Sequence, residues 1–322
     1  MSDRLKMPPV RDCGFYQRRK HDKWREVPAP EPSLEGAVAD SHAHIHMLPD
    51  PAWELARCAA NGVDYLCMIV DPAEDGSRPF DELASWEGLA ARALASGEAG
   101  DAAHELAVPR VSIAAGVHPH NAKLYDDAIE AVLMQRLADP RVGALGEVGL
   151  DYHYDLSPRD VQRSVFERQI ELAKQLGLPI ALHLRGGEDP VADNAHREAF
   201  EILEKVGFPE AGTLLHCCAL PPDELRPWVE AGCYVAYGGV ITFKNADAAR
   251  EGARLVPEDR LMVETDSPYM TPEPMRGAAC TPAHVVFTAA QLAEVRGIAP
   301  GNARARFLAK LHDNTERFYS RA

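Results

Sequence analysis

Short apolar runs alternate with longer amphipathic segments along most of this chain of 322 residues. Runs such as residues 64–71 (DYLCMIVD) and 179–184 (PIALHL) are apolar on both faces, which is typical of parallel strands covered by helices. The pattern predicts eight strands, at residues 37–46, 64–71, 111–118, 142–150, 179–185, 212–218, 234–240 and 260–266.

The segments between these runs have helical periodicity, which is clearest at residues 158–177. This segment begins with Pro158, repeats apolar residues at a spacing of three and four, and ends at Gly177. A last helix is predicted at about 301–319, where it would close the fold. Residues 97–109 delay the third strand and are predicted to be a surface insertion.

Eight strands, each followed by a helix, predict an α/β fold of the (β/α)8 TIM-barrel type rather than two domains. A doubly wound open sheet is the alternative. No GxGxxG motif follows the first predicted strand, which argues against the dinucleotide site that such sheets often carry. We assign residues 37–322 to one barrel domain and residues 1–36 to an N-terminal arm.

The arm is rich in proline and charge, and Phe15, Tyr16 and Trp24 lie among its basic residues. Those basic residues are Arg11, Arg18, Arg19, Lys20, Lys23 and Arg25. One interpretation is a segment that contacts nucleic acid through charge and stacking. We favour the other, a strap that lies on the barrel with solvated charges, because a run of charge is weak evidence of a binding site.

Composition limits the classes of protein that this chain can be. The hydrophobic share of 46% and the charged share of 26% are typical of a globular chain with a core, and they exclude general disorder. With 34 basic and 49 acidic residues, the net charge is −15, so most of the surface repels a phosphate backbone. Any contact with nucleic acid would depend on a local basic patch or on metal ions.

The cysteines and the apolar segments predict the cellular compartment of the protein. Seven cysteines without a CxxC pair favour buried thiols in a reducing compartment. The longest uncharged apolar stretch, residues 231–243, is much shorter than the ~20 residues that a membrane span needs. The N-terminus has no apolar run of the kind found in signal peptides. We expect a cytoplasmic protein without a membrane partner.

Polar residues stand at the ends of the predicted strands. The first strand ends in DSHAHIH, so His42, His44 and His46 would alternate onto one face of an extended chain. The later ends carry, in order, Glu147, His183, His216 and Asp266. Strand ends converge at one mouth of a barrel, and imidazole with carboxylate suits a divalent metal acting on water. Each residue alone could be a satisfied core histidine or a turn cap, but five strand ends coincide.

Several motifs occur in the order seen in the TatD family. They are DSHAH, AGVHPH, GEVGLDY, RQIELAKQLGLP, HLR, LLHC, GGVITFKNA and VETDSPYMTP. The chain resembles this family of metal-dependent hydrolases of the amidohydrolase superfamily, many of them described as deoxyribonucleases, over residues 37–320. The resemblance implies a TIM barrel that holds two divalent metal ions, either Zn, Mn or Mg.

The resemblance also implies a role for each residue. His42, His44 and Asp266 would bind the first metal, His183 and His216 the second, and Glu147 both. His46 stands where the family usually has Asp or Asn, so we interpret it as a supporting residue, although its position permits ligation.

The implied reaction depends on two cations that lower the pKa of a shared water. Asp266 would orient this water or take its proton, which makes Asp266 and Glu147 the expected catalytic residues. His118, His120 and Arg185 are candidates for binding the substrate by neutralising phosphate charge. Alternatively, His118 packs against Pro119 and Arg185 pairs with an acid such as Glu188.

Three segments depart from the family pattern, namely residues 183–187 (HLRGG), 216–220 (HCCAL) and 276–282 (RGAACTP). All three segments leave the expected metal ligands in place, and their differences from the family lie in residues expected to form the wall of the pocket. Cys217 and Cys218 beside His216 suggest a nucleophile, but thiols in such a position are more often packing residues.

We predict hydrolysis of phosphodiester bonds from an end of single-stranded DNA. The alternative substrates are small esters, amides or lactones, since the same metal centre attacks a carbonyl carbon. The third hypothesis is a non-catalytic barrel that binds a partner through its arm. The presence of all the expected metal ligands argues against it.

Overall fold

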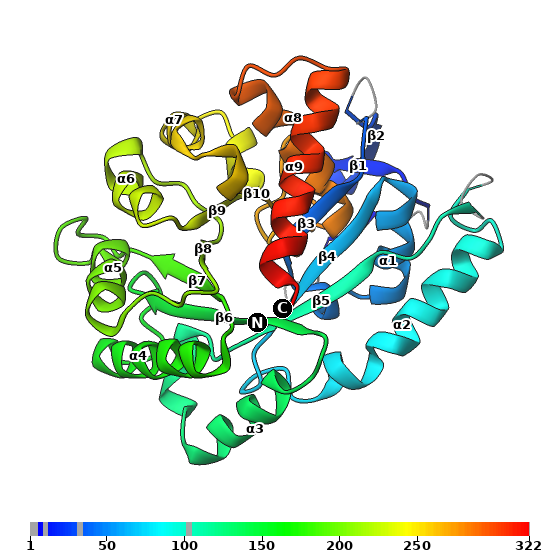
Figure 1. Ribbon diagram of the computed structural model, residues 1–322. Coiled ribbons are helices and arrows are strands. Elements are labelled where there is room, and N and C mark those ends of the chain that lie inside the picture. The colour runs from blue at the N-terminus through cyan, green and yellow to red at the C-terminus, as the bar shows by residue number, and fades with distance from the viewer. Residues whose placement is uncertain (1–5, 9–11, 31–34, 101–104, 322) are drawn as a thin grey trace.

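The computed structural model describes residues 6–8, 12–30, 35–100 and 105–321. In this part of the chain, eight parallel strands form one sheet in chain order from β3 to β10 (Figure 1). The strands are β3 (Val38–Ala43), β4 (Val63–Val70), β5 (Arg110–Ala115), β6 (Val142–Asp151), β7 (Ile180–Arg185), β8 (Thr213–Leu215), β9 (Tyr234–Tyr237) and β10 (Leu261–Val263). The TIM barrel predicted from the sequence is confirmed.

The barrel closes where the chain leaves β3 and β10. The Asp266 amide donates to the His42 carbonyl at 2.9 Å, and the His44 amide donates to the Ser267 carbonyl at 2.8 Å. Just before this junction, the buried Asp40 carboxyl accepts hydrogen bonds from the Thr265 amide at 2.9 Å and the Thr265 hydroxyl at 2.6 Å. Burial raises the pKa of Asp40 to about 8 despite these donors. The closure therefore fixes the backbone of His42 and Asp266 side by side.

Helices surround the sheet on its outer face (Figure 1). They are α1 (Pro51–Ala60), α2 (Arg78–Ala95), α3 (Asp127–Leu137), α4 (Arg159–Leu176), α5 (Ala195–Val206), α6 (Pro222–Glu230), α7 (Asp247–Leu255), α8 (Val285–Val295) and α9 (Asn302–Tyr319). The predicted helix at 158–177 is confirmed, with Gly177 in the left-handed conformation that ends it. Within the described ranges, no helix combines the length and the apolar character needed to cross a bilayer.

The last helix fills the end of the barrel where the strands begin. The inward-facing residues that pack around Phe318 and Tyr319 of α9 include five alanines, namely Ala39, Ala114, Ala144, Ala181 and Ala236. The Tyr319 hydroxyl donates to the Ser41 carbonyl at 2.8 Å. Gly143 is needed here because a Cβ at this position would overlap the Tyr319 carbonyl. The prediction that a helix at 301–319 closes the fold is confirmed.

The first strand ends earlier than predicted. β3 stops at Ala43, and the chain then turns through a 3-10 helix at Ile45–Met47, in which the Met47 amide donates to the His44 carbonyl at 3.0 Å. The prediction that His42, His44 and His46 alternate on one extended face is therefore wrong. The backbone turns because the His44 amide pairs with Ser267 instead of continuing a ladder with β4.

The described part of the N-terminal arm lies against the barrel. Its strands β1 (Phe15–Arg18) and β2 (Trp24–Val27) form an antiparallel hairpin. Phe15 is buried, with its ring centroid 4.8 Å from that of Phe287 on α8. Arg57 of α1 donates to the Gly14 carbonyl at 2.7 Å. Phe15 is thus unavailable for stacking on nucleic acid. Arg11 of the arm and residues 101–104 of the expected insertion lie outside the described residues.

Candidate metal centre

The Glu147 carboxylate is at the centre of the barrel mouth. It projects from β6 and is 5% exposed. Its Oε2 lies 3.4 Å from His42 Nε2 and 3.8 Å from His44 Nε2. Its Oε1 lies 2.6 Å from His183 Nδ1 and 2.8 Å from His216 Nε2. Each carboxylate oxygen therefore faces its own pair of histidines.

Strands and the loops just past them supply these side chains. His42 and His183 lie within β3 and β7, whereas His44, His216 and Asp266 follow the ends of β3, β8 and β10. Asp266 Oδ1 lies 3.6 Å from His44 Nε2. The rings of His42 and His216 are stacked, with centroids 3.9 Å apart. The structure thus brings all six predicted ligands together from strands that are distant in sequence.

The surrounding histidines keep Glu147 ionised. Burial by itself would raise the pKa of this carboxyl, but the neighbouring His216, His42 and His183 hold that pKa well below its ordinary value. Burial and the nearby His216 lower the pKa of His42. Despite their burial, Glu147 raises the pKa of His216 well above its ordinary value and that of His183 to about 8, so these rings bind protons that a divalent metal would displace.

The donor set fits divalent cations. The ligand atoms of His42, His44 and Glu147 lie within 4.8 Å of one another, as do those of Glu147, His183 and His216. Among the described residues, Nδ1 of the buried His42 has no hydrogen-bond partner, and Nε2 has the 3.4 Å contact with Glu147 Oε2. Such orphaned buried groups cost about 1–3 kcal/mol each, and a cation bound to one nitrogen would remove part of that cost. Glu147 belongs to both of these sets of ligands.

The three residues expected to bind substrate also lie at the mouth. His118 Nε2 is 3.8 Å from Glu147 Oε1, so this ring faces the centre. His118 Nδ1 accepts from the His120 amide at 3.1 Å, which fixes the orientation of the ring. Arg185 is exposed at the end of β7, with its guanidinium 4.7 Å from the Tyr154 ring centroid. In the part of the chain that is described, Arg185 forms no ion pair with Glu188.

Two buried acids were not predicted as part of the site. Asp151 Oδ2 lies 2.8 Å from His120 Nε2 and 3.1 Å from His183 Nε2. Glu264 Oε1 lies 3.3 Å from His216 Nδ1 and also accepts from the Cys217 amide. Carboxylates that contact the second nitrogen of a metal-binding histidine fix its orientation and raise its basicity. Both acids stand within motifs already noted, GLDY and VETD, at the ends of otherwise apolar strands.

His46 contacts a different acid from the other histidines of its motif. Its Nε2 lies 3.0 Å from Asp75 Oδ1, and Asp75 Oδ2 accepts from the Asp71 amide at 2.8 Å. The Asp71 carboxyl in turn accepts from the His118 amide at 3.1 Å. His46 therefore connects to the loop after β4, which supports His118, and this geometry agrees with a supporting role.

The thiols beside His216 do not have the properties of nucleophiles. Burial raises the pKa of Cys217 well above its ordinary value and raises that of Cys218 to about 12. All seven cysteines lie within the described residues and are free thiols. The packing interpretation of Cys217 and Cys218 is the one that the structure favours.

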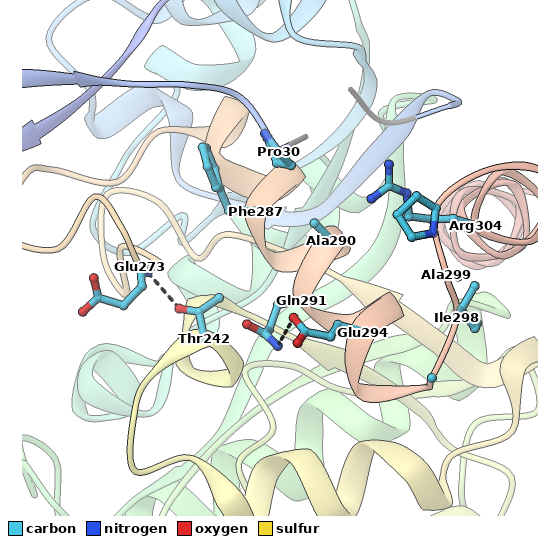
Figure 2. Close-up of a pocket in the computed structure, with 12 residues that line it drawn as sticks. Pro30, Thr242, Glu273, Phe287, Ala290, Gln291, Glu294, Ile298, Ala299 and Arg304 are labelled. Atoms are coloured by element: carbon cyan, nitrogen blue, oxygen red, sulfur yellow. Dashed lines mark hydrogen bonds between the residues drawn. The ribbon is translucent and has the colours of Figure 1, made fainter. Parts of the chain in front are cut away.

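A surface cavity of about 530 Å³ lies apart from the metal centre, along the outer side of α8 (Figure 2). Its wall includes Phe287 and Gln291 of α8, and Thr242, which accepts from the Glu273 amide at 2.8 Å. None of the residues predicted for the site lines this cavity. The cavity is thus separate from the predicted site.

Mutation of Glu264 tests whether its carboxylate orients His216 for metal binding. We expect Glu264→Gln to weaken binding of the second metal by about 10- to 100-fold, because the amide no longer holds His216 as a strong ligand. Turnover at saturating metal should change little. Titration of metal-stripped protein against a chelating indicator measures the affinity, with Glu201→Gln on the exposed face of α5 as the control. An affinity equal to that of the wild type would contradict an orienting role for Glu264.

Comparison with known proteins places the chain in a family. The model of the family described as TatD related DNase matches residues 39–320. An uncharacterized metal-dependent hydrolase, TatD of Mycobacterium tuberculosis, is 36% identical over 268 residues, which cover 80% of this chain and 90% of the relative. The human 3'-5' RNA nuclease TATDN2 is 30% identical over 325 residues, which cover 98% of this chain and 38% of the relative.

A solved structure supports the fold. The crystal structure of a TatD homolog from Escherichia coli superposes with a TM-score of 0.72 at 23% identity, covering 88% of this chain and 98% of the other. The family match spans nearly the whole barrel and includes all the motifs on which the resemblance was based. The chain therefore belongs to the TatD-related DNase family of metal-dependent hydrolases.

Proposed function

We propose that this protein uses two divalent metal ions to hydrolyse phosphodiester bonds from an end of single-stranded DNA. The observation that carries the proposal is the division of contacts at Glu147, whose Oε2 faces His42 and His44 and whose Oε1 faces His183 and His216. A carboxylate shared by two cations is the arrangement used to stabilise both oxygens of an in-line displacement at phosphorus.

Each residue of the site has its own role in the proposed reaction. When bound, the cations supply a water of lowered pKa and neutralise phosphate charge. Asp266, whose Oδ1 lies 3.6 Å from His44 Nε2, would accept the proton of that water. His118 faces Glu147, and Arg185 stands at the rim, where a cationic side chain would bind a phosphate oxygen. A histidine-rich set favours Zn or Mn over Mg in affinity.

The relatives support a nucleic-acid substrate. The human relative is described as a 3'-5' RNA nuclease, and it aligns with 98% of this chain. The net charge of −15 makes tight binding of a duplex by its backbone unfavourable, whereas a flexible single strand can enter the mouth of a barrel and reach the metals. We therefore propose single strands rather than duplexes as the substrate of this protein. Both DNA and RNA are to be assayed.

Removal of the metal provides the direct test. We expect metal-stripped protein to leave end-labelled single-stranded DNA intact. Adding back Mn²⁺, Zn²⁺ or Mg²⁺ should restore stepwise shortening, because both the nucleophile and the charge neutralisation depend on the cations. Denaturing gels follow the products, and the order of activity among the three metals identifies the preferred one.

The metal content of the protein makes a negative result informative. If two metals bind per chain and neither single-stranded DNA nor RNA is cut, the nuclease proposal is wrong. Hydrolysis of a chromogenic ester by the same preparation would then assign the centre to carbonyl substrates.

A further inference from the structure

Exposed aromatic side chains occur in this protein at one place. The chain has nine Phe, nine Tyr and four Trp, all within the described residues, and of these Tyr154 and Tyr269 alone are classed as exposed, at 52% and 50%. The Tyr154 ring centroid lies 5.4 Å from that of His120. The Tyr269 ring centroid lies 6.1 Å from that of His44. Both accessible aromatic surfaces therefore flank the metal centre.

Backbone hydrogen bonds attach each tyrosine to an acid of the site. The Tyr154 amide donates to Asp151 Oδ1 at 2.9 Å, while Oδ2 of the same carboxylate contacts His183 at 3.1 Å. The Tyr269 amide donates to the Asp266 carbonyl at 2.8 Å. The backbone of each tyrosine is thus held next to a residue of the site, which places both side chains at the mouth, where a substrate would bind.

The two tyrosines belong to different halves of the centre. Tyr269 neighbours His44, which faces Glu147 Oε2 at 3.8 Å. Tyr154 is connected through Asp151 to His183, which faces Glu147 Oε1 at 2.6 Å. A phosphate bound between the two halves would bring the nucleotides on its two sides toward different rings.

Base stacking also supplies affinity for a nucleic acid that the net charge of this protein does not supply. A chain of net charge −15 gains little from general attraction to phosphates. Aromatic side chains bind the unpaired bases of single strands by stacking, without regard to sequence, and bases paired within a duplex are not available to them. Arg185, 4.7 Å from the Tyr154 ring centroid, adds a cation at one of the two positions.

We propose that Tyr154 and Tyr269 are base-stacking subsites that hold the nucleotides on the two sides of the scissile phosphate in a single-stranded nucleic acid. This inference rests on the proposed function and adds how that substrate is recognised. It explains a preference for single strands by a contact that a duplex cannot make.

The experiment compares Tyr154→Ala and Tyr269→Ala with the matched Phe variants, in full-length metal-loaded protein. Leu89→Ala, an exposed apolar position on α2, is the control for loss of surface area. Substrates are an end-labelled oligonucleotide and two versions in which an abasic tetrahydrofuran replaces the nucleoside on one or the other side of the scissile phosphate. Metal content and kcat at saturation report whether the centre remains intact.

We expect each Ala variant to raise KM about 10-fold, with kcat and metal content near those of the wild type, whereas the Phe variants and Leu89→Ala keep the wild-type KM. Wild-type protein should show the same rise in KM on an abasic substrate. Each Ala substitution should add nothing on the one abasic substrate that lacks the base held by that ring.

Two results would overturn the inference. One is an unchanged KM in both Ala variants. The other is a penalty that persists on both abasic substrates, which would assign the effect of Tyr154 to its support of Arg185. If wild-type protein cuts the oligonucleotide and the tyrosines prove neutral, the inference alone fails. If metal-loaded wild type neither cuts nor binds single strands, the proposed function fails together with it.

Discussion

Replacing Glu147 with Gln should lower kcat by at least about 10³-fold, because the two cations together contribute several kcal/mol of transition-state stabilisation and each factor of ten corresponds to about 1.4 kcal/mol. The amide keeps the shape of the side chain and loses the negative charge that faces four histidines. Metal content should fall from two ions per chain to one or fewer, as measured by mass spectrometry of the desalted protein.

Glu201→Gln is the matched control for this substitution. Glu201 lies on the exposed face of α5, where its partner is Arg197, so the change removes an equal charge far from the barrel mouth. The free energy of unfolding of the metal-free proteins, from urea denaturation, shows whether Glu147→Gln still folds. A folded variant with two bound metals and the wild-type kcat would rule out Glu147 as the shared ligand.

Replacing Asp266 with Asn should separate metal binding from turnover. We expect kcat to fall by about 10²- to 10⁴-fold, the usual contribution of a general base, while both metals remain bound at saturating metal, because the amide oxygen and the other ligands still hold the first cation. Asp266 has a φ of 55°, in the left-handed region that Asn tolerates as well as Asp does, so the backbone should keep its conformation. Alanine would confound the result at such a position.

Kinetics at saturating metal measure this effect, and Asp247→Asn in α7 is the control, since Asp247 is exposed and pairs with the nearby Arg250 on the same helix. Loss of one metal in parallel with the loss of turnover would show that Asp266 acts as a ligand alone. Wild-type kcat in Asp266→Asn would remove it from the mechanism.

The strand positions were predictable because a parallel strand covered on both faces is apolar over its whole length. The bounds of β6, and those of the helix that ends at Gly177, are close to the predicted ones. The ends were harder to predict. His216 and Asp266 follow β8 and β10, which stop at Leu215 and Val263, because the chain at the mouth is fixed by contacts between loops instead of by strand ladders.

The supporting acids show why a residue pattern does not reveal a whole site. Asp151 and Glu264 look like any acid at the end of a strand, and their significance depends on a histidine from another strand lying about 3 Å away. In the same way, His46 has the spacing of a third strand histidine, but the turn at Ile45–Met47 directs it to Asp75.

Periodicity and motif order are local properties of the chain, and they were enough to predict the barrel, its family and Glu147 together with the five other ligands that gather around it. Tertiary structure alone decided which histidines face each oxygen of Glu147 and that Tyr154 and Tyr269 stay exposed at the mouth. It also decided that Phe318 and Tyr319 fill the opposite end of the barrel. The physical reason is that these features depend on distances of a few Å between segments far apart in sequence, which closure of the barrel sets all at once.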